Sequence, residues 1–234
     1  MPARFPIGKT LIVSPHLDDA VFGCTALIAL QPGTRVVTLF AGLPSSCAPC
    51  TEWDARSGFA DGAQAMARRR EEDAAALTEL DAVPQWLDFL DAQYRASPAE
   101  TVLADTLAAV IEREDPGTVG IPLGLFHSDH RLAHCAALRL LPRYAARRWL
   151  AYEDALYRRI PGLLQERLCA LRRQGIEATP TVVDGTLHAA RKARAVRCYA
   201  SQLRALASSG RPGLDDLSVA EGYWTLRARR VTPA

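Results

Sequence analysis

Short runs of apolar and β-branched residues alternate along the chain with longer segments of helical periodicity. Two early runs, residues 10–14 and 35–40, are predicted strands, and the second is apolar enough to be buried on both faces of a sheet. The same pattern predicts further strands at residues 86–90, 118–122, 149–152 and 223–227, and helices at 19–30, 63–80, 98–114, 129–141, 163–173 and 186–207. Strands that alternate with helices are typical of an α/β fold, so we expect a Rossmann-like three-layer sandwich with a largely parallel sheet.

A long loop is predicted at residues 41–62, which contain Gly, Pro, Ser and two cysteines. Loops of this length in compact domains usually serve a function. Farther along, Ser97 is expected to cap the helix at residues 98–114. No internal repeat or low-complexity linker interrupts the pattern, which predicts a single domain over residues 1–234.

Composition narrows the class of protein. With 234 residues, of which 49% are hydrophobic and 23% charged, the chain is expected to be globular. A net charge of +2 gives no general reason to bind a polyanion. All but two of the 28 basic residues are arginines, but they are spread along the chain among few aromatics. We therefore expect no nucleic-acid partner.

Two kinds of sequence signal bear on the location of the protein, membrane spans and signal peptides. No uncharged apolar run approaches the ~20 residues of a membrane span, and no signal-peptide pattern opens the chain. We therefore expect no membrane partner and a cytoplasmic location. The six cysteines are scattered, and in that compartment free thiols are the default. Cys47 and Cys50 form a CxxC pair, which we interpret as loop thiols because no second pair completes a zinc site.

Two polar motifs follow predicted strands. His16, Asp18 and Asp19 come just after the first strand, and residues 127–130, His-Ser-Asp-His, lie a few residues beyond the fourth. Open α/β sheets bind ligands at the carboxyl ends of their strands. An aspartate there is by itself more often a helix N-cap, but three of the five histidines gather in these two motifs. Their joint occurrence favours a metal site, such as zinc with three protein ligands and a position for water.

The two motifs resemble those of the PIG-L/LmbE-like zinc-dependent deacetylases, which hydrolyse N-acyl groups, typically from N-acetylglucosamine-type sugars. Residues 16–19 read His-Leu-Asp-Asp, where the family has a His-Pro-Asp-Asp-like segment. The resemblance continues in residues 69–74, 152–154 and 192–202, in the family's order, and so covers most of the chain. It implies an LmbE-like fold and a hydrolase of C–N amide bonds.

For the metal, the resemblance implies one Zn²⁺ per chain, with another divalent metal as the alternative, bound by His16, Asp19 and His130. His134 follows His130 by four residues and lies on the same helical face, but the family pattern does not use it. We interpret His134 as a supporting or packing residue. His188 has no partner nearby in sequence and is interpreted as structural.

For catalysis, the resemblance implies that Asp18 is the general base for a zinc-activated water and that His127 is the second catalytic group. Asp129 is expected to hold His127 as an imidazolium that stabilises the oxyanion, because a nearby opposite charge raises the pKa of histidine. Either His127 or the protonated Asp18 would give a proton to the departing amine. The chain also departs from the family, with Ala20 where many members are acidic and Leu125 where some have a tyrosine donor. Catalysis then depends on zinc and His127 alone, or on a donor from another loop.

Two residues are candidates for binding the substrate. The resemblance assigns Arg69 to hydroxyl or phosphate contacts and Asp91 to sugar hydroxyls. The alternatives are a solvated helix face with ion pairs for Arg69 and a loop cap for Asp91.

The sequence therefore predicts a metal-dependent hydrolase that removes an N-acyl group, acetyl above all, from a small amino sugar or related conjugate. A homo-oligomer is compatible with this prediction. The alternative is a nucleotide- or cofactor-binding Rossmann-like protein without hydrolase activity. Against it, the first strand is followed by neither a G-x-G-x-x-G turn nor a P-loop.

Overall fold

A seven-stranded sheet forms the centre of the protein in the computed structural model, which describes residues 8–45, 48–207 and 214–229. The strand order is β3-β2-β1-β4-β5-β7-β6, parallel from β3 to β5 and antiparallel at β7 and β6. The strands are β1 (Thr10–Ser14), β2 (Arg35–Thr38), β3 (Val83–Trp86), β4 (Thr118–Pro122), β5 (Arg148–Tyr152), β6 (Ile176–Thr181) and β7 (Tyr223–Ala228). This sheet confirms the predicted α/β class.

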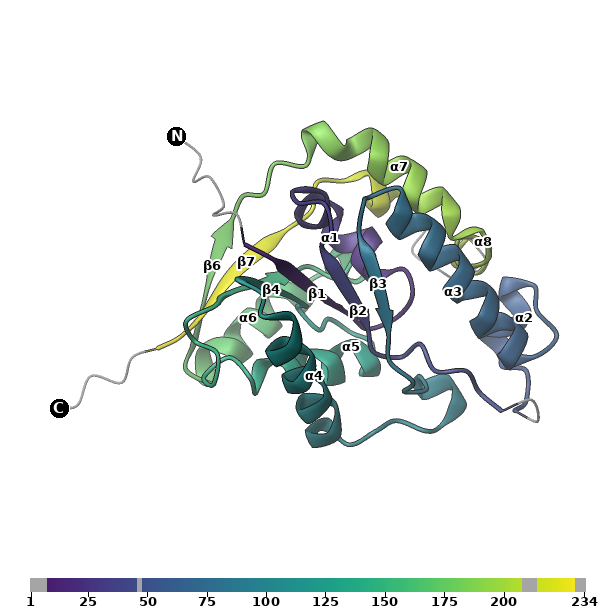
Figure 1. Cartoon of the computed structure of the whole chain (residues 1–234), viewed down its shortest axis with the longest axis horizontal. Coiled ribbons are helices and arrows are strands. Elements are labelled where there is room, and N and C mark those ends of the chain that lie inside the picture. The colour runs from purple at the N-terminus through teal and green to yellow at the C-terminus, as the bar shows by residue number, and fades with distance from the viewer. Residues whose placement is uncertain (1–7, 46–47, 208–213, 230–234) are drawn as a thin grey trace.

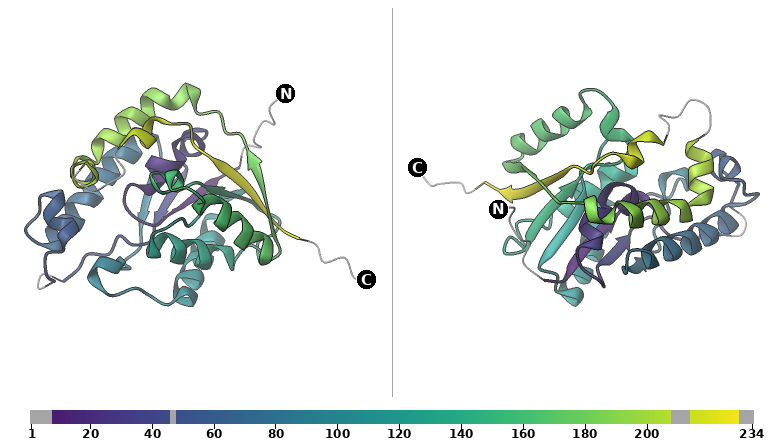
Figure 2. Two further views of the ribbon diagram at one scale, coloured as in Figure 1. Left: turned by 180° about the vertical axis from the view of Figure 1, so that it is seen from behind. Right: turned by 90° about the horizontal axis from the view of Figure 1, so that it is seen from above.

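Helices cover both faces of the sheet, as Figures 1 and 2 show. β1 illustrates the reason, because Leu11 and Val13 belong to one hydrophobic core and Ile12 to the other. Within the described residues, no helix is both long and apolar enough to cross a membrane. One face carries α1 (Asp19–Ala29), α3 (Gly62–Thr78) and α7 (Ala189–Cys198), and the other carries α4 (Glu100–Glu114), α5 (Ser128–Leu138) and α6 (Leu163–Arg173).

The order of the strands reverses at β1, which lies between β2 and β4. From β1 the chain proceeds outward through β2 and β3, and then returns to β4 and β5 on the other side. Connections that leave in opposite directions open a crevice at the carboxyl ends of the two central strands. The two histidine motifs follow β1 and β4, so both start at this crevice.

The edge strands differ from the prediction. The third strand is not residues 86–90, since β3 ends at Trp86, and β6 was not predicted at all. Leu87 and Phe89, which favoured the later run, pack against the core from an irregular segment. Both edge strands are only partly buried, and each contains a proline, Pro84 or Pro180. Proline is tolerated at a sheet edge, where burial no longer imposes a clear hydrophobic pattern.

The start of α4 also corrects the prediction. Ser97 does not cap the helix, because Ala99 is the N-cap and makes no side-chain cap hydrogen bond. The backbone of Ala99 is extended, with φ −66° and ψ 145°, so the chain turns helical only at Glu100. The carboxylate of Glu100 in the first turn supplies the negative charge that favours a helix N-terminus.

The predicted loop at residues 41–62 contains a short helix, α2 (Glu52–Ser57). Thr51 and Asp54 form a reciprocal capping box at its start, and Gly58 ends it with φ 94°. The Trp53 indole N–H donates to Gln202 Oε1 at 2.9 Å, which ties this loop to the C-terminal part of the chain. The Tyr94 hydroxyl also donates to Asp54, at 3.1 Å. The described part of the loop is therefore held by the caps of α2 and by hydrogen bonds to distant segments.

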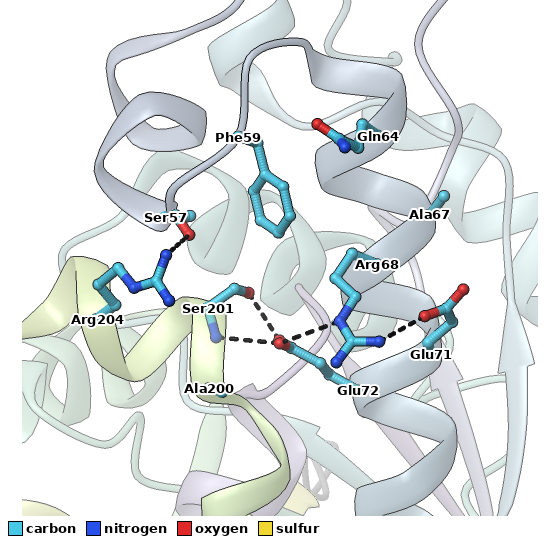
Figure 3. A pocket seen from close by; sticks show the side chains of 10 residues that line it. All are labelled: Ser57, Phe59, Gln64, Ala67, Arg68, Glu71, Glu72, Ala200, Ser201 and Arg204. Carbon is cyan, nitrogen blue, oxygen red and sulfur yellow. Dashed lines mark hydrogen bonds and ion pairs between the residues drawn. The ribbon is translucent and has the colours of Figure 1, made fainter.

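The predicted helix at residues 186–207 is broken into a 3₁₀ turn (Thr186–His188), α7 and α8 (Ala200–Leu206). The break is at Tyr199, whose buried hydroxyl donates to Asp73 of α3 at 2.7 Å. Next to it, Glu72 accepts hydrogen bonds from the Ser201 backbone N–H and hydroxyl (Figure 3). Residues 69–74 and 192–202, two segments of the family resemblance, therefore hold α3 and α8 together through these hydrogen bonds. A pocket of about 380 Å³ lies beside them.

Another part of the resemblance, Lys192, supports the helix that follows β1. α1 is kinked at Cys24, where the backbone leaves helical geometry. The Lys192 ammonium donates to the Phe22 carbonyl at 2.9 Å and to Glu221 at 2.6 Å. Glu221 in turn accepts the backbone N–H groups of Thr25 and Ala26 at 3.0 and 2.8 Å. This ion pair satisfies both broken ends of the kinked helix and so fixes the direction of its first turn.

Candidate active site

The segment after β1 is held in a tight turn. The Ser14 hydroxyl donates to the His16 carbonyl at 2.7 Å and accepts the Ala20 backbone N–H at 3.0 Å. Asp19 Oδ2 accepts the backbone N–H of His16 at 2.9 Å and lies 3.1 Å from the Nδ1 of the same histidine. Asp18 has a φ of 155°, a rare conformation for a residue other than glycine, in the turn between them. The turn thus brings a histidine and two carboxylates to the end of one strand.

The second motif meets the first across the crevice. His127 is the N-cap of α5, and its Nδ1 accepts the Asp129 backbone N–H at 3.2 Å. His130, in the first turn of α5, points its Nε2 at Asp19 Oδ2, 3.1 Å away. His16, Asp19 and His130, predicted together from two separate motifs, are therefore direct neighbours.

A carboxylate supports each of the two histidines from behind. Asp154, after β5, has no exposed side-chain surface, and its Oδ1 lies 2.6 Å from His130 Nδ1. Asp129 Oδ2 lies 3.0 Å from His16 Nε2 and also accepts the Ala92 backbone N–H at 2.9 Å. The sequence interpretation did not include Asp154 in the site. The signal was its position two residues after a strand end, like that of His16.

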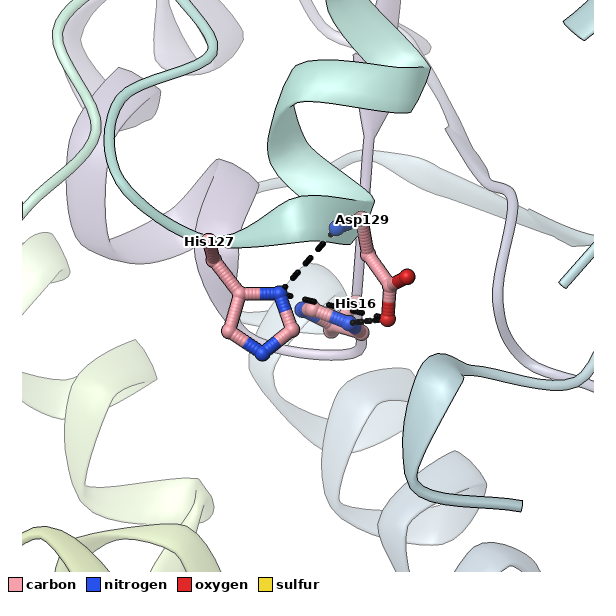
Figure 4. A group of neighbouring side chains, drawn as sticks. All are labelled: His16, His127 and Asp129. Atoms are coloured by element: carbon pink, nitrogen blue, oxygen red, sulfur yellow. Dashed lines mark hydrogen bonds and ion pairs between the residues drawn. The ribbon is translucent and has the colours of Figure 1, made fainter. Parts of the chain in front are cut away.

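Two groups of side chains have donor atoms close enough to share a metal ion, each within 4.8 Å of one another. One is His16, Asp19 and His130, and the other is His16, His127 and Asp129, drawn in Figure 4. In the first group, each histidine can face a metal with one nitrogen and donate its other N–H to Asp129 or Asp154. That pairing of metal-binding histidine with carboxylate is the usual arrangement in proteins. In the second group Asp129 would itself be a ligand and could not also orient His16, so the residues present fit a metal ion best in the first group.

The three candidate ligands, His16, Asp19 and His130, shift one another's pKa values. Burial by itself lowers the pKa of His16, but hydrogen bonds to Asp129 and Asp19 outweigh it and raise the pKa to about 9. Burial also opposes the charged form of His130, yet Asp19 and Asp154 hold its pKa well above the usual value. The two histidines in turn keep the pKa of Asp19 well below its usual range despite burial. The carboxylates thus favour positive charge at the point where the donor atoms converge.

Two other titratable groups in the cavity, Asp18 and His127, also have shifted pKa values. Burial, and then the neighbouring Asp19 carboxylate, raise the pKa of Asp18 to about 7, against smaller opposing effects of Arg69 and the histidines. This places Asp18 where a carboxylate can exchange a proton near neutral pH. Burial, followed by His16 and His130, lowers the pKa of His127 to about 4.

The geometry places Asp129 nearer to His16 than to His127, the partner expected from the sequence. Asp129 Oδ2 is 3.9 Å from His127 Nδ1 but only 3.0 Å from His16 Nε2. Because His127 Nδ1 already accepts a backbone N–H, the N–H of a neutral His127 is on Nε2. Of the two histidines, His16 is therefore the nearer partner of Asp129.

A cavity of about 270 Å³ opens over these groups and contains both predicted substrate residues. Arg69 is 3% exposed, which excludes the alternative of a solvated helix face, and its Nη1 lies 3.8 Å from Asp91 Oδ2. Asp91 also accepts the Gln93 backbone N–H at 3.1 Å, so it caps a 3₁₀ turn (Ala92–Tyr94) as well as lining the cavity. Further lining residues that the sequence interpretation missed are Phe22, Trp53, Gln93, Leu156, Tyr157 and Gln202.

The remaining candidates from the sequence lie outside the cavity. His134 is buried, and its Nδ1 lies 2.9 Å from the Pro122 carbonyl, which links α5 to the end of β4. His134 is thus a packing residue, one of the two interpretations given above. Cys47 lies outside the described residues, while Cys50 is exposed and its thiol contacts the Thr51 and Phe59 carbonyls at 3.5 Å. Leu125, at the position of the missing tyrosine, is buried, whereas another loop brings Tyr157 to the cavity.

The fold and site together define an α/β protein with a histidine–aspartate group for a metal at the switch point of its sheet. The PIG-L family, described as GlcNAc-PI de-N-acetylase, matches residues 11–141, more than half of the chain. The chain therefore belongs to the PIG-L family, and it is an amide-bond-hydrolysing enzyme of the deacetylase class. This outcome favours the predicted hydrolase over the nucleotide-binding alternative. No curated protein sequence matches the chain.

Solved structures share the fold over nearly the whole chain. The zinc-inhibited form of teicoplanin deacetylase Orf2 has a TM-score of 0.80 at 24% identity, covering 96% of this chain and 100% of that one. The A40926 pseudoaglycone deacetylase Dbv21 has a TM-score of 0.74 at 26% identity, covering 96% and 99%. GalB, the 4-carboxy-2-hydroxymuconate hydratase of Pseudomonas putida KT2440, has a TM-score of 0.60 at 23% identity, covering 97% and 99%. Because one fold carries deacetylases and a hydratase, substrate and mechanism have to be argued from the site.

Proposed function

We propose that the protein is a metal-dependent deacetylase that removes an N-acetyl group from an amino sugar of the N-acetylglucosamine type within a small glycoconjugate. The observation that carries this proposal is the convergence of His16, Asp19 and His130, with Asp18 beside them in one cavity. Two histidines and one carboxylate are a ligand set of catalytic zinc sites, which leave a coordination position open.

One zinc ion per chain is proposed, held by His16 Nδ1, Asp19 Oδ2 and His130 Nε2, with another divalent metal as the alternative. Asp129 and Asp154 would orient the two imidazoles through their other nitrogens. When bound, the metal supplies Lewis acidity that polarises an acyl carbonyl and lowers the pKa of water.

The proton transfers are assigned to two side chains. Asp18, with its pKa near neutral pH, takes a proton from the attacking water. His127 donates its Nε2–H to the acyl oxygen as negative charge develops there. Because the pKa of His127 is low, it has no second proton to give, and Asp18 returns its proton to the departing amine. Arg69 and Asp91, in the same cavity, are proposed to bind hydroxyl groups of the sugar.

The proposed function is tested by amine release. The protein loaded with Zn²⁺ is incubated with a panel of N-acetylglucosaminides, and free amine and acetate are measured in parallel. We expect equal amounts of both products, loss of turnover in chelator, and recovery when one equivalent of metal is restored. Absence of amine release across the panel by fully metal-loaded protein would contradict the proposal.

A substitution behind the ligands tests the metal assignment. Asp154→Asn should weaken metal affinity by about 10- to 100-fold, because the amide no longer orients His130 through a charged hydrogen bond. Competition with a chromophoric chelator measures the change. Asp115→Asn, at an exposed carboxylate remote from the cavity, is the matched control and should bind metal like the unmodified protein. Equal affinity in both variants would argue against His130 as a ligand.

Other predictions from the sequence belong to this proposal as well. The cytoplasmic location and the absence of a nucleic-acid or membrane partner stay predictions, and a homo-oligomer is compatible with them. The native metal is also part of the proposal, and a series of divalent metals in the amine-release assay ranks the candidates.

A further inference from the structure

An exposed aromatic residue lies directly beside the catalytic cavity. Phe126 is 61% exposed, although it precedes His127, which lines the cavity. Its ring is 5.3 Å from the ring of Tyr157, centroid to centroid, at an interplanar angle of 31°. Tyr157 lines the cavity and Phe126 does not. The two rings, here called the aromatic rim, therefore lead from the cavity wall to solvent.

The conformation of Phe126 shows that its exposure is imposed by the fold. Its φ is 57°, and the His127 backbone N–H donates to the Leu125 carbonyl at 2.7 Å, which makes Phe126 the centre of a γ-turn. A γ-turn with positive φ is strained, especially at a bulky residue. The Leu125 N–H is fixed at 2.9 Å by Asp154, the carboxylate that also supports His130. Strain of this kind persists where surrounding contacts dictate it and gathers at functional sites.

The other half of the rim is equally fixed. Leu156, just before Tyr157, has a φ of 69°, and its N–H donates to the buried Asp216 at 2.7 Å. Arg158, just after Tyr157, donates from Nε to the same carboxylate at 2.9 Å. The Tyr157 ring is edge-on to His130 at 5.3 Å and stacked with His127 at 6.4 Å. The rim is thus rigid and continuous with the groups that act on the amide.

The size of the cavity indicates what the rim would contact. At about 270 Å³ it lies just below the usual range for pockets that enclose a drug-sized ligand. One acylated sugar would fill it, and whatever the sugar is attached to would have to lie outside, against the rim. The exposed Phe126 ring, packed on Tyr157 at the edge of the cavity, can contact another flat ring in an offset or edge-to-face arrangement at 4.5–7 Å.

We infer that the aromatic rim is a subsite for an aryl aglycone, so that the preferred substrates are N-acetylamino sugars linked to an aromatic group. This inference rests on the proposed deacetylase function and adds the substrate class. The rim orients the aglycone and takes no part in the proton transfers.

The test compares phenyl with methyl N-acetyl-β-D-glucosaminide, both as substrates in amine release and as ligands in calorimetry. We expect the phenyl compound to have a kcat/KM and an affinity about five- to tenfold higher. Phe126→Ala should reduce that ratio to near one, whereas Phe126→Tyr, which keeps the ring, should retain it. Leu187→Ala removes another exposed apolar side chain, 86% exposed and outside the cavity lining, and should leave the ratio as it is.

The possible results separate the two proposals. A ratio near one in the unmodified protein, or a ratio that Phe126→Ala does not change, would overturn the subsite even if both compounds are deacetylated. If neither compound is deacetylated, the proposed function fails for them, and calorimetry still decides whether the rim prefers the phenyl ligand. Thermal unfolding of each variant confirms that a lost preference does not reflect a lost fold.

Discussion

Replacing Asp18 by asparagine should lower the deacetylation rate by a factor of about 10² to 10⁴ while leaving the metal bound. The carboxylate lies in the cavity with a pKa raised to about 7, so it can accept a proton from water near neutral pH. An amide of the same size cannot accept that proton. Metal analysis and steady-state kinetics on the same preparation measure both effects, and we expect the loss in kcat rather than in KM.

Asp105→Asn is the control for this experiment, because Asp105 is exposed on α4 and does not line the cavity. Its turnover should equal that of the unmodified protein. If Asp18→Asn turned over at the unmodified rate, Asp18 could not be the base. If it lost metal together with activity, Asp18 would belong to the ligand set, and the division of labour between Asp18 and Asp19 would be wrong.

Replacing His130 by alanine should remove the metal from the purified protein and reduce turnover by at least about a hundredfold. His130 is 2% exposed, and its two nitrogens lie against Asp19 and Asp154, as expected of a metal-binding histidine that a carboxylate orients. Metal content after dialysis, measured by atomic spectroscopy, is the primary measurement. Circular dichroism shows whether the variant is folded, and His130→Gln, which retains most of the volume, serves if the alanine variant is not.

The same measurement separates the two groups that could hold a metal. If the ligands are His16, Asp19 and His130, His127→Ala should retain the metal and lose only part of the activity. If the ligands are His16, His127 and Asp129, the outcomes of His127→Ala and His130→Ala should be reversed. His188→Ala controls for the removal of a histidine outside the site and should keep both metal and activity.

The interior of the fold could be predicted from sequence, whereas its edges could not. β1 and β4 agree with the predicted bounds, because both are buried along nearly their whole length and have apolar residues at their centre. β3 and β6 are partly exposed, so their hydrophobic pattern is weak. The prediction placed β3 too late in the chain and did not include β6. α2 was missed because its stability comes from a capping box and from the hydrogen bond between Trp53 and Gln202, neither of which is a periodic signal.

For the site, the sequence by itself determined which residues would lie together, because His16, Asp18, Asp19, His127 and His130 stand in two short motifs after central strands. Parallel strands end at the same edge of a sheet, so motifs placed there must meet. Only the tertiary structure decided the partners of those residues. Asp129 lies within hydrogen-bond distance of His16 but not of His127, and Asp154 lies against His130, because hydrogen-bond partners depend on differences of less than an ångström between elements far apart in the chain.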